Sequence, residues 1–336
     1  MRPNLFSIAT KELSQDAFIA WLLKWASPEC EKFDAALSDC AKKFASKLLS
    51  LQIEPPSTIT KVEAGRQLEN IDVWAKINGK YLLIIEDKIF AGKHSNQLER
   101  YREWANAWCI KNNFQLVCVY LKTGSESNTI LEEAKKQGFA VFMRRDFLEI
   151  LNCSPVNNHI FSDFKERLQG MEDEENQFMQ KPIKDWCDPD WRGFYQALEK
   201  KRFVKWEYVN NYNGGFWNAV LNWNELKDCC PYMQIEQGPL CFKVGEVYEK
   251  HSDLRNRYHN IFMAHCAGRG DIRRPDRFGA GTYMTIAVVD RTNWLGEDDS
   301  LVNLDKVVAR LNEYEQLNFQ MVTQLRNEIN TTQHPL

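Results

Sequence analysis

The chain has 336 residues, of which 44% are hydrophobic and 12% aromatic, and this is enough to bury a separate core in each of two domains. Its formal net charge of -3 excludes a protein that coats nucleic acid through bulk positive charge. No window approaches the roughly 18 uncharged apolar residues of a membrane span, and the first residues lack the apolar region of a signal peptide, so we expect a cytoplasmic protein with no membrane partner.

The first half of the chain changes from helical to alternating periodicity and back. Apolar residues recur at helical spacing over 12–26 and 31–51, and Pro55 and Pro56 end the second helix. The later segments are predicted in the order strand 58–65, strand 68–77, strand 80–89, helix 91–110, strand 114–121, helix 129–138, strand 139–143 and helix 145–152. This order predicts an α/β domain over residues 1–170, with a mixed sheet flanked by helices.

An acidic segment, residues 171–190, is the expected linker after this domain. It contains two prolines and a block of four acids from Glu172 to Glu175. The alternative is a solvated helix that joins two halves of one domain. Residues 191–336 then predict a second, α+β domain, whose role would be substrate recognition or partner binding. We expect a helix over 190–209, antiparallel strands within 214–226, 232–247 and 282–290, a helix over 249–266 and a long helix from 301 to about 330.

The second half also contains a cluster of aromatic residues and a loop rich in arginine. We interpret the aromatic residues as core and keep open a surface on which bases stack. They are Trp206, Tyr208, Tyr212, Phe216, Trp217 and Trp223. The loop over 268–283 carries Arg269, Arg273, Arg274 and Arg277. Arginine suits phosphate, but Asp271 and Asp276 cancel part of the charge, and this favours an exposed polar connector.

Three charged residues, Asp72, Glu86 and Lys88, stand at the ends of apolar runs in the predicted hairpin. Because side chains alternate along a strand, Glu86 and Lys88 share one face and Asp87 points to the other. A two-residue turn at Asn78-Gly79 would place Asp72 and Glu86 on opposite faces. We therefore predict a three-residue turn or a bulge, with Gly79 in the left-handed region, that shifts the register by one residue and brings both carboxylates together.

Two carboxylates that converge at a strand end are hard oxygen ligands suited to Mg²⁺ or Mn²⁺, and the backbone carbonyl of Asp87 can supply a further oxygen. Lys88 would orient or help to deprotonate an attacking water and would stabilise the charge that grows on a phosphodiester. One alternative is a solvated ion pair between Glu86 and Lys88 at the strand end. Glu63 and Glu69 flank the same hairpin and are rival ligands.

The sequence Ile71-Asp72 followed by Glu86-Asp87-Lys88 resembles the D…(D/E)xK motif of the PD-(D/E)XK nuclease superfamily. Gln97 and Tyr101 are similar to the QxxxY element of its RecB-like members, although on a helix they could also be a surface glutamine and an amphipathic tyrosine. The segment ELSQDAFIAWLL resembles the first helix of an uncharacterised bacterial branch, in which an early acidic residue, here Glu12, supports the metal. Otherwise Glu12 only complements the helix dipole.

The resemblance implies a restriction-endonuclease-like fold and a Mg²⁺- or Mn²⁺-dependent endonuclease that hydrolyses DNA. Asp72, Glu86, Lys88 and Glu12 would be catalytic, and Asp72, Glu86, the Asp87 carbonyl and Glu12 would hold the metal. Gln97 and Tyr101 would position the substrate strand. The alternative is a catalytically inactive, nuclease-like module that binds nucleic acid or a partner. The oligomeric state is open, and a homodimer is compatible with the sequence.

Ten cysteines without CxxC spacing predict reduced, packed thiols rather than a zinc site.

Overall fold

The chain divides into two compact units, Met1–Asp173 and Glu174–Leu336. In the computed structural model of the protein, residues 2–90, 96–153, 155–210 and 214–333 are described, without the side chains of 329–333. The boundary falls inside helix α7 (His159–Asn176), close to the predicted end of the first domain.

Residues 171–190 differ from the expected linker. They form the end of α7 and two short helices, η2 (Gln177–Met179) and η3 (Ile183–Asp185), before α8 begins. Phe178 and Ile183 are buried in the core of the second unit. The reason is that apolar side chains lie between the acids and the prolines, and burying them outweighs the solvation of the acidic residues around them.

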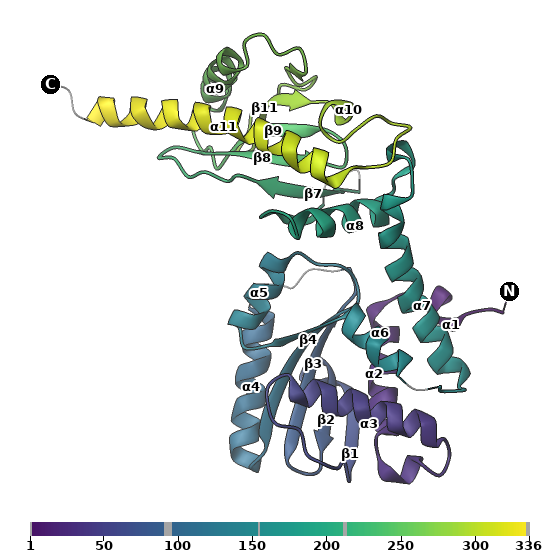
Figure 1. Ribbon diagram of the computed structural model, residues 1–336. Helices are drawn as coiled ribbons and strands as arrows, with labels where there is room; N and C mark the ends of the chain where they lie inside the picture. Colours follow the sequence, from purple (N-terminus) through teal and green to yellow (C-terminus); the bar gives the residue numbers. More distant parts are fainter. Residues whose placement is uncertain (1, 91–95, 154, 211–213, 334–336) are drawn as a thin grey trace. The chain divides into compact units, whose positions relative to one another are not determined.

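The first unit contains a five-stranded mixed sheet in the order β1-β2-β3-β4-β5 (Figure 1). The strands are β1 (Val62–Leu68), β2 (Ile71–Ile77), β3 (Tyr81–Lys88), β4 (Gln115–Lys122) and β5 (Ala140–Met143). Neighbours are antiparallel from β1 to β3 and parallel from β3 to β5. This architecture confirms the predicted α/β fold with a mixed sheet.

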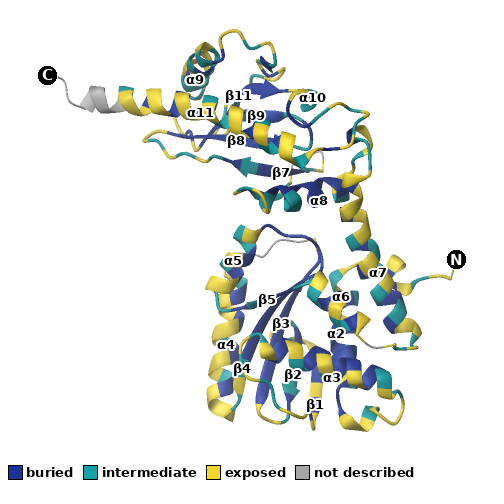
Figure 2. Cartoon of the chain, in the orientation of Figure 1, coloured by how far each residue is buried: buried dark blue, intermediate teal, exposed yellow. Residues whose placement is uncertain are grey.

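Helices cover both faces of this sheet, so its central strands are buried (Figure 2). On one face α2 (Glu12–Trp25), α3 (Ala35–Ser50) and α6 (Arg144–Asn152) pack against Leu83 and Ile85. On the other face α4 (Gln97–Asn112) and α5 (Asn128–Lys136) pack against Leu82 and Ile84. The short helices α1 (Leu5–Ile8) and η1 (Pro28–Cys30) complete the unit. The alternation of side chains along β3 therefore assigns each residue to one helical layer.

The turn between β2 and β3 has the length that the sequence predicts. Ile77 pairs with Tyr81, so the turn has three residues, and the ladder runs to the pair Val73 and Ile85. In this register the next two residues, Asp72 and Glu86, belong to the same face. Gly79 has φ +62°, in the left-handed region, as does Asn78 at φ 56°. The predicted one-residue shift of register is confirmed.

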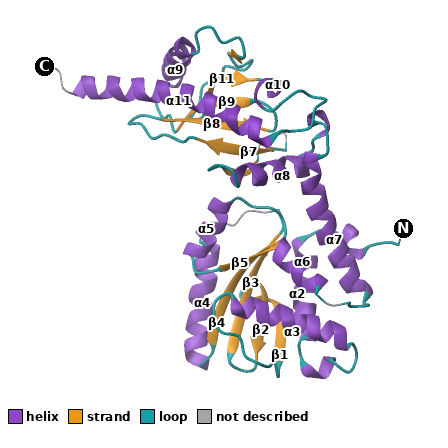
Figure 3. Ribbon diagram, in the orientation of Figure 1, coloured by secondary structure: helices purple, strands orange, loops and turns teal. Residues whose placement is uncertain are grey.

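The second unit contains a six-stranded antiparallel sheet in the order β10-β11-β9-β8-β7-β6 (Figure 3). Its strands are β6 (Lys205–Val209), β7 (Phe216–Leu221), β8 (Cys230–Glu236), β9 (Leu240–Gly245), β10 (Ile272–Arg273) and β11 (Met284–Val289). Its helices are α8 (Asp188–Glu199), α9 (His251–His265), α10 (Arg291–Trp294) and α11 (Leu304–Gln333). The predicted helix over 190–209 is wrong after Glu199, where α8 ends, and its last five residues form strand β6, because Trp206 is buried in the core that the sheet shares with the helices.

Three smaller expectations can be compared with the structure. All ten cysteines are free thiols, as predicted, and seven of them are buried, but Cys30 is partly exposed and Cys153 and Cys187 are exposed, so the predicted packing is wrong for these three. In the arginine-rich loop, Arg269 pairs with Asp271, and Arg273 pairs with Asp276 and Asp290, which agrees with a polar connector at these two positions. Within the described residues, no helix combines the length and the apolar character that a bilayer crossing requires.

The turn generates a stability prediction. No atom of the described residues lies within 4 Å of a Cβ added at Gly79. Gly79→Ala would therefore lower the free energy of unfolding only through the strain of the left-handed backbone, by about 1 kcal/mol. Gly170→Ala is the control, because Gly170 lies in α7 with equally open space and should gain about 0.5–1 kcal/mol. Urea unfolding measures both changes. Equal effects of the two substitutions would contradict the assigned backbone conformation.

Candidate active site

Asp72, Glu86 and Lys88 meet at one end of the central hairpin. Lys88 Nζ lies 2.6 Å from Glu86 Oε1 and 3.4 Å from Asp72 Oδ2, and it donates a hydrogen bond of 3.0 Å to the carbonyl oxygen of Asp87. All three oxygens of the predicted ligand set at the strand ends therefore converge on a single cationic atom. The strand-end ion pair between Glu86 and Lys88 is present, but it is buried rather than solvated.

The backbone fixes Asp72 in this position. The backbone N–H of Asp87 donates a hydrogen bond of 3.0 Å to Asp72 Oδ2, the same oxygen that faces Lys88. Asp72 belongs to β2, and Asp87 belongs to the neighbouring strand β3. The orientation of the first carboxylate thus depends on the register that the three-residue turn sets.

Glu86 is a buried carboxyl group whose ionised form requires nearby positive charge to be stable. Its side chain is 1% exposed, and Oε2 has no hydrogen-bond partner among the described residues. Burial, followed by the charge of Asp72, raises the pKa of Glu86 to about 8, although Lys88 acts in the opposite direction. A cation bound between the two carboxylates would offset both effects, because its positive charge stabilises the ionised form of Glu86 and balances the charge of Asp72.

Lys88 is held in its charged form. Burial acts to lower the pKa of Lys88, but the charges of Glu86, Asp72 and Glu12 outweigh burial and raise it above the ordinary value for lysine. In this geometry Lys88 is an ammonium ion that donates hydrogen bonds. It therefore fits the predicted roles of orienting a water and stabilising negative charge better than the role of a base.

Glu12 reaches the same end of β3 from the other helical layer. It is the first residue of α2, and its Oε1 accepts a hydrogen bond of 2.8 Å from the backbone N–H of Ile89, one residue after β3. Its charge also acts on Lys88. Glu12 therefore contacts the backbone at the end of β3, next to Lys88. A favourable interaction with the helix dipole alone does not account for this contact.

The side chain of Asp87 lies on the opposite face from Glu86 and Lys88, as the alternation predicts. Gln15 Nε2 donates a hydrogen bond of 2.7 Å to Asp87 Oδ1, and Thr123 Oγ1 donates one of 2.8 Å to Gln15 Oε1. Asp16 is a further neighbour that influences the pKa of Asp87. This buried network links α2, β3 and the end of β4. It was not identified in the sequence, where Gln15 and Asp16 are ordinary polar residues of a helix.

Gln97 and Tyr101 lie on α4, over the face of the sheet that carries Glu86. Gln97 Nε2 donates a hydrogen bond of 2.9 Å to Tyr101 Oη, and Gln97 Oε1 is buried without a partner among the described residues. Burial raises the pKa of Tyr101, and the charges of Glu86 and Asp72 add to this effect. Tyr101 is buried, with 7% of its surface exposed, and Gln97 is only partly exposed, so the alternative of a surface glutamine does not describe Gln97.

Two further residues next to the site come from β4. Lys122 pairs with Lys88 in the parallel register and forms a buried ion pair of 2.9 Å with Glu126. The hydroxyl of Tyr120, opposite Glu86 in that register, is buried without a hydrogen-bond partner among the described residues. Neither residue was predicted to belong to the site, because both stand at the end of a continuous apolar strand. Their position next to Glu86 and Lys88 follows from the parallel pairing of β3 with β4.

The rival ligands lie elsewhere. Glu63 is half exposed and forms an ion pair of 2.6 Å with Lys61, and its register partner is Lys76 rather than Asp72. Glu69 is an exposed residue in the turn between β1 and β2, with φ 51°. The expectation that either could replace Asp72 or Glu86 has no support in the described contacts.

The donor set fits a hard divalent cation through oxygens alone. No cluster of three or more His, Cys, Asp or Glu side chains with metal-binding geometry occurs in the described part of the chain. The set therefore consists of two carboxylates and a backbone carbonyl, whose oxygens already surround one cationic atom. Mg²⁺ is commonly held by one or two carboxylates and keeps several waters.

Comparison with known proteins gave one match. The profile described as the PD-(D/E)XK nuclease superfamily matches residues 3–210, which include the whole first unit except its first two residues. No curated protein and no solved structure matches the chain significantly.

The buried network around Asp87 generates a prediction about pH. Burial, followed by the charge of Asp72, raises the pKa of Asp16 to about 6, and burial followed by the charge of Asp16 raises that of Asp87 well above its ordinary value. Both groups therefore contribute stability below pH 4 that is lost as the pH rises through the folded pKa values. Without metal, the melting temperature should fall between pH 5 and pH 8.

The variant Asp87→Asn should reduce this fall, because its amide can bind Asp16 without a second charge. Over this pH range the wild type should lose about 1–3 kcal/mol of unfolding free energy, which is the free energy that corresponds to a pKa raised by about one to two on folding. Asp39→Asn, an exposed carboxylate on α3, is the matched control and should keep the wild-type slope. Melting curves in EDTA measure all three proteins, and an unchanged slope in Asp87→Asn would exclude this origin of the pH dependence.

Proposed function

Because the chain belongs to the PD-(D/E)XK nuclease superfamily, we propose that it is a Mg²⁺- or Mn²⁺-dependent endonuclease that hydrolyses phosphodiester bonds in DNA. Members of this superfamily usually hydrolyse phosphodiester bonds with the help of divalent metal ions. The observation that carries the proposal is the convergence of Asp72 Oδ2, Glu86 Oε1 and the Asp87 carbonyl on the Lys88 ammonium.

In the proposed reaction Asp72, Glu86 and the Asp87 carbonyl hold the cation. When bound, the cation supplies positive charge that polarises the phosphate and makes water a better nucleophile. Lys88 remains an ammonium, donates a hydrogen bond to the attacking water or to a phosphate oxygen, and stabilises the negative charge that develops there. Asp72 keeps its orientation through the backbone N–H of Asp87.

Other residues position the participants. Glu12 holds the backbone of Ile89 at the end of β3, which supports Lys88, and we propose that it assists the metal from this outer position. Gln97 and Tyr101 orient the substrate strand from α4, with the buried oxygen of Gln97 as an acceptor that a nucleotide group could satisfy. None of these side chains forms a covalent bond with the substrate.

The second candidate is a nuclease-like module that binds without cleaving. The geometry favours the enzyme, since Asp72, Glu86 and Lys88 are all present and oriented toward one another. A site that no longer cleaves has no need for two carboxylates close together, one of them buried without a hydrogen-bond partner on Oε2.

Cleavage of plasmid and single-stranded DNA in the presence of Mg²⁺ or Mn²⁺ tests the proposal. Asp72→Ala and Lys88→Ala should each reduce the rate by at least about 10²-fold, because each removes charge stabilisation at the reacting phosphate. Lys76→Ala on β2 and Lys80→Ala in the turn are matched controls outside the site and should keep the wild-type rate. Absence of metal-dependent cleavage by the wild-type protein on every substrate would favour the binding module.

A measurement of metal affinity distinguishes the role of the proposed ligands from the role of Lys88. Because the ammonium of Lys88 contacts all three proposed ligand oxygens, we expect Lys88→Met to bind Mn²⁺ several-fold more tightly than the wild type while losing cleavage. Asp72→Asn should bind Mn²⁺ at least about tenfold more weakly, and Lys80→Met should be unchanged. Calorimetric titration of metal-free protein gives the affinities. Equal Mn²⁺ affinity in Asp72→Asn and the wild type would remove Asp72 from the ligand set.

A further inference from the structure

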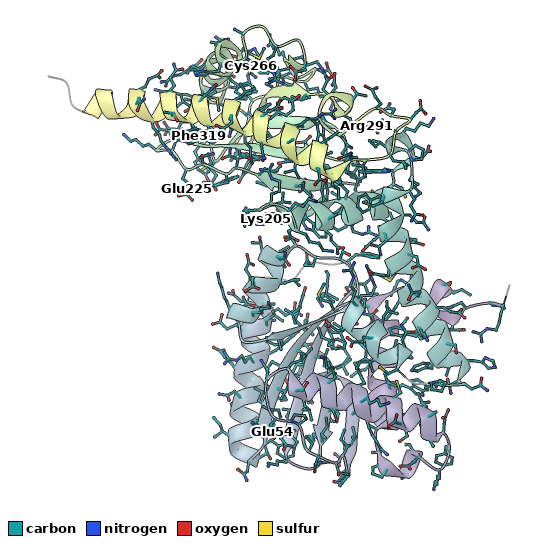
Figure 4. All side chains as sticks on the ribbon, viewed as in Figure 1. Glu54, Lys205, Glu225, Cys266, Arg291 and Phe319 are labelled. Atoms are coloured by element: carbon teal, nitrogen blue, oxygen red, sulfur yellow. The ribbon has the colours of Figure 1, made fainter. Side chains whose placement is uncertain are left out.

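The sheet of the second unit has a face that its helices do not use. Side chains of α8, α9 and α11 form one core with alternate residues of the strands, among them Trp206, Trp217 and Phe242. By the same alternation, the other face carries Lys205, Glu207, Asn218, Tyr232, Gln234 and Lys243, and we call it the open face. Lys205, which projects from the edge strand β6, is labelled in Figure 4.

The open face is hollowed rather than flat. It lines a cavity of about 720 Å³, which is in the size range of sites for small organic ligands. Tyr232 and Gln234 line it and are 3% and 7% exposed, although they point away from the helical core. A concave surface that contains buried polar side chains is a candidate ligand-binding site.

Aromatic rings form one wall of the cavity. Trp223 and Tyr232 lie with their ring centroids 4.8 Å apart and their planes at 38°. The rings of Tyr232 and Tyr283 both lie within 3.1 Å of where a Cβ of Gly245 would be, so Gly245 leaves space for them. Trp223 is 39% exposed, and this leaves part of its surface available for stacking. Phe216 also lines the cavity, from β7.

Amide groups and charged side chains line the same cavity. Asn218 and Gln234 line the cavity, and the amide of Gln234 donates a hydrogen bond of 3.0 Å to Glu236 Oε1. Lys243 Nζ donates one of 2.6 Å to the same oxygen. Amides and carboxylates present both donors and acceptors in fixed positions, which is what recognition of the edge of a heterocycle requires.

The balance of charge argues against a site for phosphates. Lys205 and Lys243 line the cavity together with Glu207 and Glu246, so the charged side chains compensate one another. A groove that follows a phosphate backbone carries excess positive charge. A planar, uncharged and polar-edged group fits better, and the nucleobase is the group with these properties in the substrate class proposed above.

We propose that the open face of the second unit binds unpaired nucleobases of single-stranded nucleic acid by stacking on Trp223 and hydrogen bonding to Gln234 and its neighbours. The identity of the ligand rests on the proposed function, but binding does not require cleavage. Of the aromatic residues noted in the sequence, Phe216 and Trp223 lie at this cavity, Trp206 and Trp217 belong to the core, Tyr208 lies on the opposite face, and Tyr212 lies outside the described residues.

Fluorescence anisotropy with labelled 12-nucleotide strands and the matching duplex, in EDTA, tests the proposal on the full chain without cleavage. Trp223→Ala and Gln234→Leu should each weaken binding of the single strand by at least about tenfold. Tyr208→Ala is the matched control, since Tyr208 has the same 39% exposure but lies on the opposite face, and it should bind as the wild type does. The affinity should depend only weakly on salt, because few phosphate contacts form.

Each outcome decides the proposal. Single strands bound more tightly than duplex, with losses in both variants, support it, whether the strand is DNA or RNA. No binding of single strands, equal binding of duplex, or unchanged binding by Trp223→Ala overturns it. If single strands bind in EDTA but the wild-type protein never cleaves with metal, the proposed nuclease function fails and the binding face stands. If cleavage occurs but Trp223→Ala binds normally, only the binding face fails.

Discussion

The three-residue turn between β2 and β3 is the constraint on which the site depends. Because side chains alternate along a strand, a turn shorter by one residue would move Asp72 to the face of Asp87, away from Glu86 and Lys88. The left-handed conformations of Asn78 and Gly79 make the longer turn accessible. A local backbone preference in a surface turn thus determines which side chains meet at the other end of the hairpin.

The site places like charges together and balances them with one cation. Glu86 is buried next to Asp72, which is unfavourable for two carboxylates unless positive charge lies between them. In the protein alone Lys88 supplies that charge and contacts each of the three oxygens. The same geometry that makes Lys88 a partner of the carboxylates would make it a competitor of the proposed metal ion. Metal affinity would then depend on the side chain that is proposed to act on the phosphate.

The two units use their sheets differently. In the first unit, helices cover both faces of the sheet, and the charged residues of the buried strand β3 stand together at its end, where Glu86 and Lys88 lie. In the second unit the helical core occupies one face, and polar and aromatic side chains along the strands line a cavity on the other. Polar side chains therefore gather at strand ends where both faces of a sheet are covered, and along the strands where one face is left open.

The sequence by itself determined the order of elements in the first unit, the length of the turn, and the sharing of one face by Glu86 and Lys88, because alternation and turn geometry are local properties. It also indicated Glu12, Gln97 and Tyr101, through resemblance to a family. Only the tertiary structure decided that Lys88 contacts three oxygens at once, that Gln15 and Asp16 surround Asp87, and that Lys205–Val209 is a strand rather than the end of a helix. These features depend on contacts between residues far apart in the chain, and no local pattern encodes such distances.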